Sequence, residues 1–188
     1  TFDTASVWIS AQTGFFDYSL NPSFQWYEEW YKVNGIIKGN WSCTNYNGNG
    51  MKFAVFNPVN GNPWISINDG SGYGPYENLH CRNYDWPDFD YYTVLSNPTS
   101  QNEWHLRMAA LLDTVPDGHY VLAFSHRNHN AQNYPEELYQ GFESIGSGYI
   151  RAISNNRPYM IFGRKGDPIG SAQESIGAEL TSVVKGDY

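Results

Sequence analysis

The sequence predicts a β-rich α+β domain, and three observations support this. Aromatic residues make up 17% of the 188 residues, with 15 Tyr, 10 Phe and 7 Trp, a profile typical of β-rich extracellular domains. Short apolar runs bounded by Gly, Pro and Asn recur along the chain, as strands do. Two segments in the second half have helical spacing instead. We expect a single domain, 1–188, with an N-terminal segment 1–45 and a core 46–180.

The expected strands are short and mostly apolar. The strongest is Met-Lys-Phe-Ala-Val-Phe at 51–56, followed by a turn and a return strand at 64–67. The aromatic run 15–31 lines either a sheet face or a binding surface. The other expected strands are residues 6–11, 36–38, 89–95, 119–125 and 159–162.

Two helices are expected between the later strands. The first starts at a Thr99 or Ser100 cap and ends before the Pro-Asp-Gly turn at 116–118. The second starts at Pro135, with two glutamates in its first turn, and runs to Phe142.

The stretch RPYMIFGRKGDPIG at 157–170 combines an apolar run with glycines and cations. A phosphate loop needs Lys followed by Ser or Thr at the start of a helix, whereas Lys165 is followed by Gly, Asp and Pro. The simplest interpretation is a buried strand that leaves the core through a glycine turn, with its cations at the surface.

Charge excludes some partner classes. The chain has 11 Lys+Arg against 19 Asp+Glu, a net charge of -8, which opposes binding to nucleic acid and to anionic membrane surfaces. No run of about 20 apolar residues is present, so we expect no membrane insertion.

Cys43 and Cys81 have no metal-site or redox spacing. Both lie in polar, loop-like sequence, so we expect a disulfide between them. The alternative is a pair of buried thiols.

Several sequence pieces, in order, resemble the interleukin-like EMT inducer family, also called PANDER-like. They include GMKFAVFN at 50–57, Asp-Gly at 117–118, Ile-Gly-Ser at 145–147 and MIFGRKG at 160–166, and VWISAQTG at 7–14 is similar to the family's first strand. The resemblance implies a compact β-sandwich of two mainly antiparallel sheets with two or three flanking helices. It also implies a secreted protein without a catalytic triad or a metal centre. Bacterial relatives are modules of large surface proteins, and we expect this chain to be such a module.

A related stem domain, in the glycosyltransferase that extends O-mannose, binds a β-linked N-acetylglucosamine-type sugar through three polar positions. Carried over, these positions fall on Asn49, on or near Asn128, and on Asn156 or Arg157. An amide replaces at least one charge of that set, so the resemblance predicts the place of a pocket better than its ligand.

Sugar recognition needs planar hydrogen-bonding groups and flat aromatic faces. The candidates of the first kind are Asn49, His126, Arg127, Asn128, His129, Asn156 and Arg157. The candidates of the second kind are Tyr73, Tyr76, Tyr84 and Trp86, in the long loop 68–88, and the alternative for each of these rings is packing within the loop. Similarly, the alternative for His126 and His129 is a pair of solvated loop residues.

A metal is not expected, although Asp85, Asp88 and Asp90 are weak calcium candidates because alternating acids on an extended chain can meet one ion. Catalysis is also not expected. Carboxylate pairs for glycoside hydrolysis would come from Glu28, Glu29, Asp85, Asp88, Glu103 or Glu143, with nothing in the sequence to pair any two.

The sequence therefore predicts a non-catalytic, extracellular, monomeric module without a cofactor that binds carbohydrate. The alternatives are a structural or protein-interaction module, with a cell-surface protein as partner, and a glycoside-active enzyme.

Overall fold

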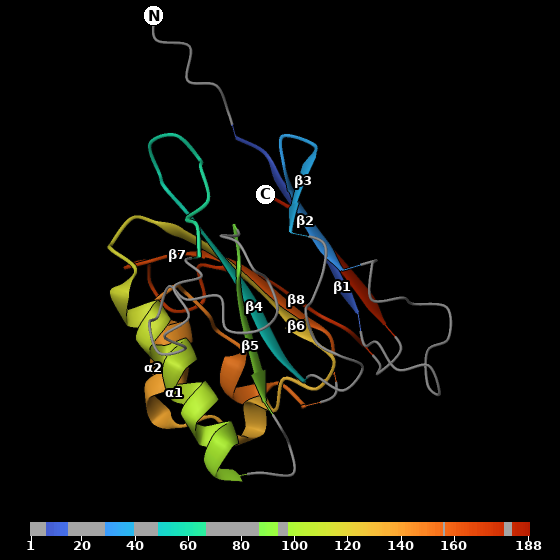
Figure 1. Ribbon diagram of the computed structural model, residues 1–188, viewed down its shortest axis with the longest axis vertical. Helices are drawn as coiled ribbons and strands as arrows, with labels where there is room; N and C mark the ends of the chain where they lie inside the picture. The colour runs from blue at the N-terminus through green and yellow to red at the C-terminus, as the bar shows by residue number, and fades with distance from the viewer. Residues whose placement is uncertain are drawn as a thin grey trace, which may run out of the picture.

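The computed structural model describes residues 7–14, 29–39, 49–66, 87–93, 98–155, 157–178 and 182–188. These form two sheets and two α-helices, stacked as three layers (Figure 1). The four-stranded sheet has the order β3-β2-β1-β9, and the five-stranded sheet has the order β5-β4-β6-β7-β8. All described strand pairs are antiparallel. The predicted β-rich sandwich with flanking helices is confirmed.

The element bounds follow the chain. The four-stranded sheet contains β1 (Ile9–Gly14), β2 (Trp30–Val33), β3 (Ile36–Gly39) and β9 (Val183–Asp187). The five-stranded sheet contains β4 (Asn49–Phe56), β5 (Phe89–Thr93), β6 (Tyr120–His126), β7 (Tyr159–Arg164) and β8 (Gln173–Ile176). The helices are α1 (Pro98–Thr114) and α2 (Glu136–Glu143), with short 3-10 helices at Ala131–Asn133 and Ile150–Ala152.

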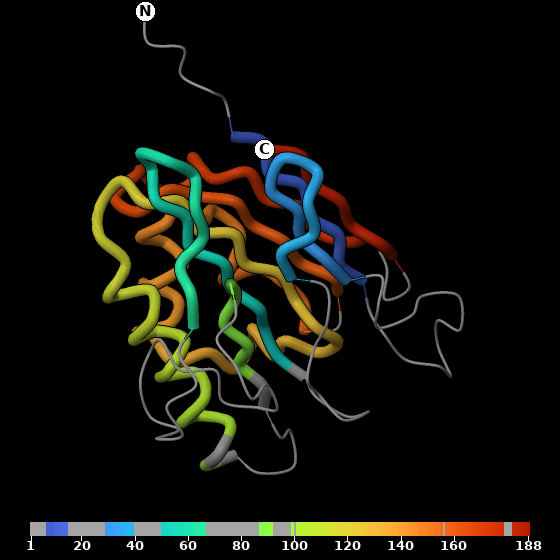
Figure 2. Tube along the Cα trace, turned by 45° about the horizontal axis from the view of Figure 1, so that its top comes forward, coloured from blue at the N-terminus to red at the C-terminus, as the bar shows by residue number. Residues whose placement is uncertain are grey.

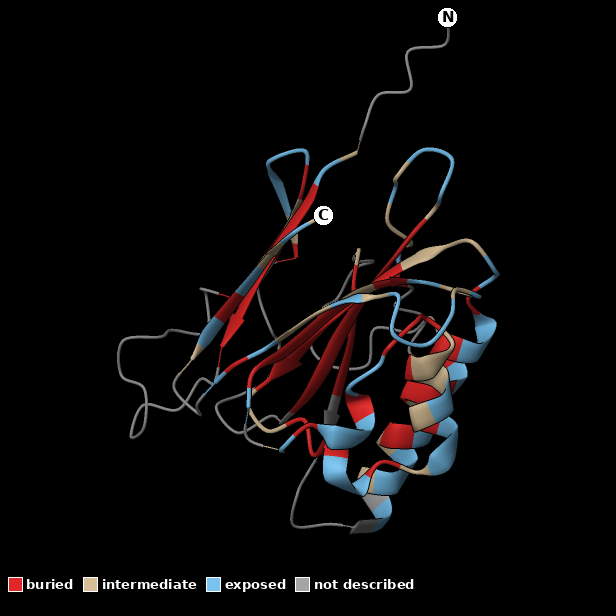
Figure 3. Ribbon diagram, turned by 180° about the vertical axis from the view of Figure 1, so that it is seen from behind, coloured by how far each residue is buried: buried red, intermediate tan, exposed pale blue. Residues whose placement is uncertain are grey.

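The five-stranded sheet is buried on both faces. Met51, Phe53 and Val55 of β4 pack towards α1 and α2, whereas Ala54 and Phe56 pack towards the four-stranded sheet. Figure 3 shows this sheet as buried and the outer sides of the helices as exposed. Burial on both faces explains why β4 and β6 are nearly continuous apolar runs instead of alternating ones.

The four-stranded sheet joins the two ends of the chain. The first and last strands, β1 and β9, lie side by side, with Ala11 opposite Gly186 (Figure 2). The sequence had suggested the strand at 159–162 as the last one, which is wrong, because β8 and β9 follow it. Both are short and largely exposed, so they lack the long buried apolar run on which a sequence-based prediction depends.

The predicted return strand at 64–67 is also absent from the residues described there. An isolated bridge joins Phe56 to Pro63, and the Trp64 N–H donates to Val55 O (2.7 Å). Pro63 has no N–H to continue a ladder, so the hairpin stops after one turn.

The Gly-Arg-Lys-Gly segment, 163–166, contains the end of β7, and the backbone requires glycine at both of its glycine positions. A Cβ on Gly163 would lie 1.9 Å from Ile145 O, and Gly166 has φ +89°. Arg164 is exposed, as predicted. Lys165 is not simply at the surface, because its half-buried Nζ donates to Leu112 O (2.8 Å) and Ser144 Oγ (2.9 Å). It therefore ties together the C-terminal ends of α1 and α2, where a cation is favoured.

Candidate functional site

The five-stranded sheet has one polar edge, where three segments meet. The strands β4 and β7 both run antiparallel to β6, with Gly50 opposite His126 and Met160 opposite Phe124. The start of β4, the end of β6 and the start of β7 therefore lie together. Here we define the polar edge as Arg127, Asn128 and Arg157, with the backbone of Asn49.

Several predicted site residues lie outside the part of the chain that the structure describes. These are Tyr73, Tyr76, Tyr84, Asp85, Trp86, Asn156 and the cysteines Cys43 and Cys81. The predictions that rest on them, including the disulfide and the aromatic faces, stay predictions.

The loop that follows β6 is held by its own side chains. Asn130 Oδ1 accepts from Asn133 Nδ2 (2.8 Å) and Asn155 Nδ2 (2.9 Å), while Asn128 Oδ1 accepts from the Asn130 N–H (2.9 Å). Arg127 and Asn130 have φ values of +52° and +58°, a conformation that few residues other than glycine adopt. Strained backbone of this kind is concentrated at binding and catalytic sites.

His129 stabilises this loop from the interior of the protein. Its side chain is fully buried, Nδ1 accepts from the Ala131 N–H (3.2 Å), and Nε2 therefore carries the proton donated to Arg157 O (2.9 Å). Burial lowers the pKa of His129 to about 4, so the ring is neutral at pH 7. The alternative of a solvated loop histidine is wrong, and His129 links the β6 loop to the start of β7.

His126 is also buried, which sequence alone did not suggest. Its Nδ1 donates to Glu29 Oε2 at 2.6 Å, and neither side chain is more than 3% exposed. Since Thr13 on the neighbouring β1 donates to Ser125 O at 2.5 Å, the end of β6 is fixed from the four-stranded sheet. His126 therefore positions the polar edge from inside the sandwich.

More charge lies in the same layer between the sheets. Lys52 is fully buried, lies opposite Asp90 on β5, and has its Nζ 5.9 Å from the ring centre of Phe124. Asp88 is also buried, close enough to Gly39 that a Cβ there would lie 2.4 Å from Asp88 Oδ2. The layer between the sheets thus has an apolar end, at Ile9 and Phe56, and an ionisable end.

Sequence reasoning missed Lys52 and the role of Glu29. A lysine within the apolar run 51–56 was the available signal, since a charge in a strand buried on both faces must itself be buried. Nothing local marked Glu29, because its partner lies 97 residues away.

The structure describes two of the three residues that were weak calcium candidates. Asp88 and Asp90 are buried, and Asp85 is outside the description. Among the described residues, no three His, Cys, Asp or Glu side chains are grouped in a way that would hold a metal ion.

The described part also contains no helix long and apolar enough to cross a membrane.

Two cavities lie away from the polar edge. One, of about 480 Å³, lies between α1 and α2. The other, of about 390 Å³, lies at the apolar end of the sandwich and is lined by Phe56, Tyr120, Phe162 and Tyr188.

Fold and site together define a β-sandwich module with helices on one outer face and a polar edge next to a hydrogen-bonded loop. The family model of the interleukin-like EMT inducer matches residues 49–167, well over half of the chain. The chain therefore belongs to the interleukin-like EMT inducer family. No curated protein matches it.

The buried histidines predict a pH-dependent stability. His105 on α1 packs against Tyr134, with the two ring centres 4.8 Å apart. Burial also lowers the pKa of His105 to about 4. Between pH 6.5 and 4 the unfolded chain binds protons that the folded chain does not, so the free energy of unfolding should fall as pH is lowered through this window. Each histidine should contribute about 3 kcal/mol of that loss by pH 4.

Urea unfolding at a series of pH values would check this, with His105→Gln as the comparison. The variant should lose less stability than the wild type between pH 6.5 and 4. Parallel curves would contradict the assignment of this loss to His105.

Proposed function

We propose that the chain is a non-catalytic, secreted module that binds carbohydrate at the polar edge. The observation that carries the proposal is the meeting of the start of β4, the end of β6 and the start of β7, which brings Arg127, Asn128 and Arg157 to one end of the sheet, next to a loop held by its own hydrogen bonds. Guanidinium and amide groups pair with neighbouring sugar hydroxyls. A preorganised loop reduces the entropy lost when the sugar binds.

Arg157 is the main ligand candidate. Its side chain is exposed, and its one described side-chain bond is a long one, from Nη1 to Gly177 O (3.4 Å). Most of its five donors are therefore available to a ligand. Its backbone carbonyl is fixed by His129, so the residue starts from a defined position.

Of the carboxylates that the sequence suggested for glycoside hydrolysis, the described ones are paired or buried. Glu29 is buried against His126, while Glu103 pairs with Arg107 and Glu143 with Arg151. Asp88 and Asp90 are buried in the layer between the sheets. A hydrolase needs an acid and a second carboxylate facing the same open cleft.

The aromatic run 15–31 would favour a protein partner if it formed one exposed patch. Of this run, the structure describes 29–31. Tyr31 is fully buried, and Lys32 Nζ lies 4.2 Å from the ring centre of the half-buried Trp30. This end of the run therefore does not favour the interaction module over the carbohydrate-binding one.

A glycan array with the isolated chain would test the proposal. Selective binding is expected, with affinity reduced about tenfold or more in Arg157→Ala, the loss of roughly one good charge-assisted contact. Arg164→Ala is the matched control, because Arg164 is also exposed and lies at the opposite end of β7. It should bind as the wild type does.

Asn128→Asp refines the test. An aspartate still accepts from the Asn130 N–H but has no amide donor, so the loop should keep its shape while sugar affinity falls. A folded wild-type protein that binds no glycan, or equal binding by Arg157→Ala, would overturn the proposal.

A further inference from the structure

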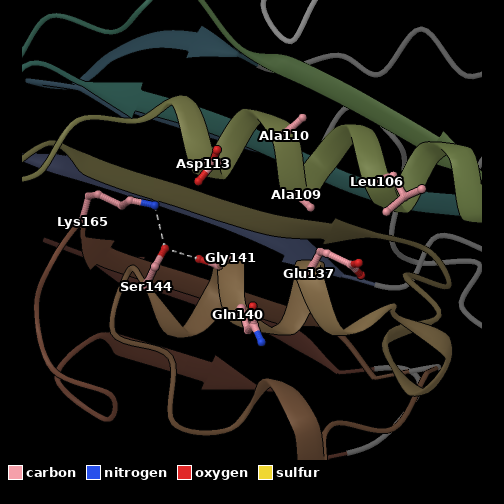
Figure 4. Close-up of a pocket in the computed structure, with 9 residues that line it drawn as sticks. All are labelled: Leu106, Ala109, Ala110, Asp113, Glu137, Gln140, Gly141, Ser144 and Lys165. Atoms are coloured by element: carbon pink, nitrogen blue, oxygen red, sulfur yellow. Dashed lines mark hydrogen bonds between the residues drawn. The ribbon is translucent and has the colours of Figure 1, made fainter.

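The outer, helical layer carries a second candidate site, which is independent of the polar edge. A groove of about 480 Å³ runs between α1 and α2 (Figure 4). Small residues make it hollow: Ala109 and Ala110 line it from α1, and Gly141 from α2. The helices are close together here, since a Cβ on Gly141 would lie 3.1 Å from Leu112 Cδ1. Leu106, 42% exposed, adds an apolar side chain.

Two of the residues that line this groove are carboxylates, Asp113 and Glu137. Neither Asp113 nor Glu137 forms an ion pair or a side-chain hydrogen bond within the described residues, and both are exposed. Other helix acids are paired instead: Glu103 with Arg107 at 2.6 Å, and Glu136 with Arg151 at 2.6 Å. The two groove acids thus lack the close, hydrogen-bonded ion pairs that the other helix acids form.

Lys165 attracts Asp113 electrostatically, so it offsets part of the negative charge at one end of the groove and leaves Glu137 as the carboxylate without a cationic partner among the described residues. It closes one end of the groove, where Figure 4 shows it near Asp113 and bonded to Ser144. Its Nζ is bonded to Leu112 O and Ser144 Oγ, so it compensates the partial negative charge of two helix ends. The rest of the groove keeps an apolar floor beside the uncompensated Glu137.

We propose that this groove binds a basic segment of a protein partner. A large apolar side chain of the segment would lie on Leu106, Ala109 and Ala110, and Lys or Arg side chains next to it would pair with Asp113 and Glu137. Charge complementarity selects this chemistry, because an acidic or uncharged peptide would leave both carboxylates without a close ion pair. The site is on the helical layer, so its function does not depend on the polar edge.

Fluorescence anisotropy with three labelled peptides of about 12 residues would test the proposal, a length that spans such a groove. One peptide contains Lys, Arg and Leu. The second has Glu in place of each cation, and the third has Ser in place of each Leu. We expect the first to bind and the other two not to bind. Amide shifts in NMR spectra of the complex should centre on Leu106, Ala110 and Gln140.

Variants separate the groove from general attraction to an acidic protein. Glu137→Gln should weaken binding about fivefold, and Ala110→Trp, at an exposed position that keeps the fold, should abolish it. Asp187→Asn removes the same charge from β9 and should change affinity less than about twofold. Failure of the basic peptide to bind, equal weakening by Asp187→Asn, or shifts centred elsewhere would overturn the proposal.

Discussion

Replacing Gly163 with alanine is expected to prevent folding or to reduce the free energy of unfolding by at least about 4 kcal/mol. Gly163 lies within β7, opposite Val121, and a Cβ there would lie 1.9 Å from Ile145 O and 3.1 Å from Ala172 Cβ. The clash is with backbone, so no side-chain rotation relieves it. The segment after α2 would have to move away from the sheet, and Ile145 would leave the core.

Gly170→Ala is the matched control for this variant. Gly170 has φ +85° but no atom within 4 Å of its added Cβ, so alanine there costs only about 1 kcal/mol of backbone strain. Thermal and urea unfolding of both variants would measure the difference. Equal stabilities would contradict the steric explanation of the glycine in this family segment.

Replacing Glu29 with alanine is expected to cost about 3 kcal/mol or more of stability, because the variant leaves His126 buried without its carboxylate. The pair joins β6 to the residue preceding β2, so it also holds the two sheets together at their ionisable end. Glu29→Gln keeps an oxygen acceptor for the His126 Nδ1–H and should cost less.

Glu103→Ala is the control for burial. Its ion pair with Arg107 has the same 2.6 Å separation as the Glu29–His126 pair, but Glu103 is 57% exposed. Its removal should therefore cost less than about 1 kcal/mol. Urea unfolding of the two alanine variants at pH 7 tests this, and equal losses would show that the buried pair contributes no more than a surface one.

The Glu29→Ala variant should also affect the polar edge. Because Arg127 and Asn128 directly follow His126, loss of the Glu29 contact should loosen the loop that carries them. Glu29→Ala is therefore expected to reduce ligand affinity while Arg157 is still present, and a thermal melt would distinguish this effect from unfolding.

Much of the fold could be predicted from local sequence. The apolar runs at 51–56, 119–125 and 159–162 indicated β4, β6 and β7, because a strand buried on both faces contains few polar residues. Helical spacing indicated α1 and α2 to within about two residues, as expected for boundaries. Once these strands are antiparallel, the ends that carry Asn128 and Arg157 must meet at one edge.

Only the tertiary structure decided which charges are buried. Lys52, Asp88, Asp90 and His126 lie on one face of the five-stranded sheet, and that face is covered by strands from the two ends of the chain. No pattern within a strand indicates that β1, β2 and β9 will cover it, since those contacts join residues far apart in sequence. The sequence alone therefore determined β4, β6, β7, the two helices and the polar ends of these strands. Burial by the second sheet determined which of the polar groups lie inside the sandwich, because that burial depends on contacts between segments far apart in the chain.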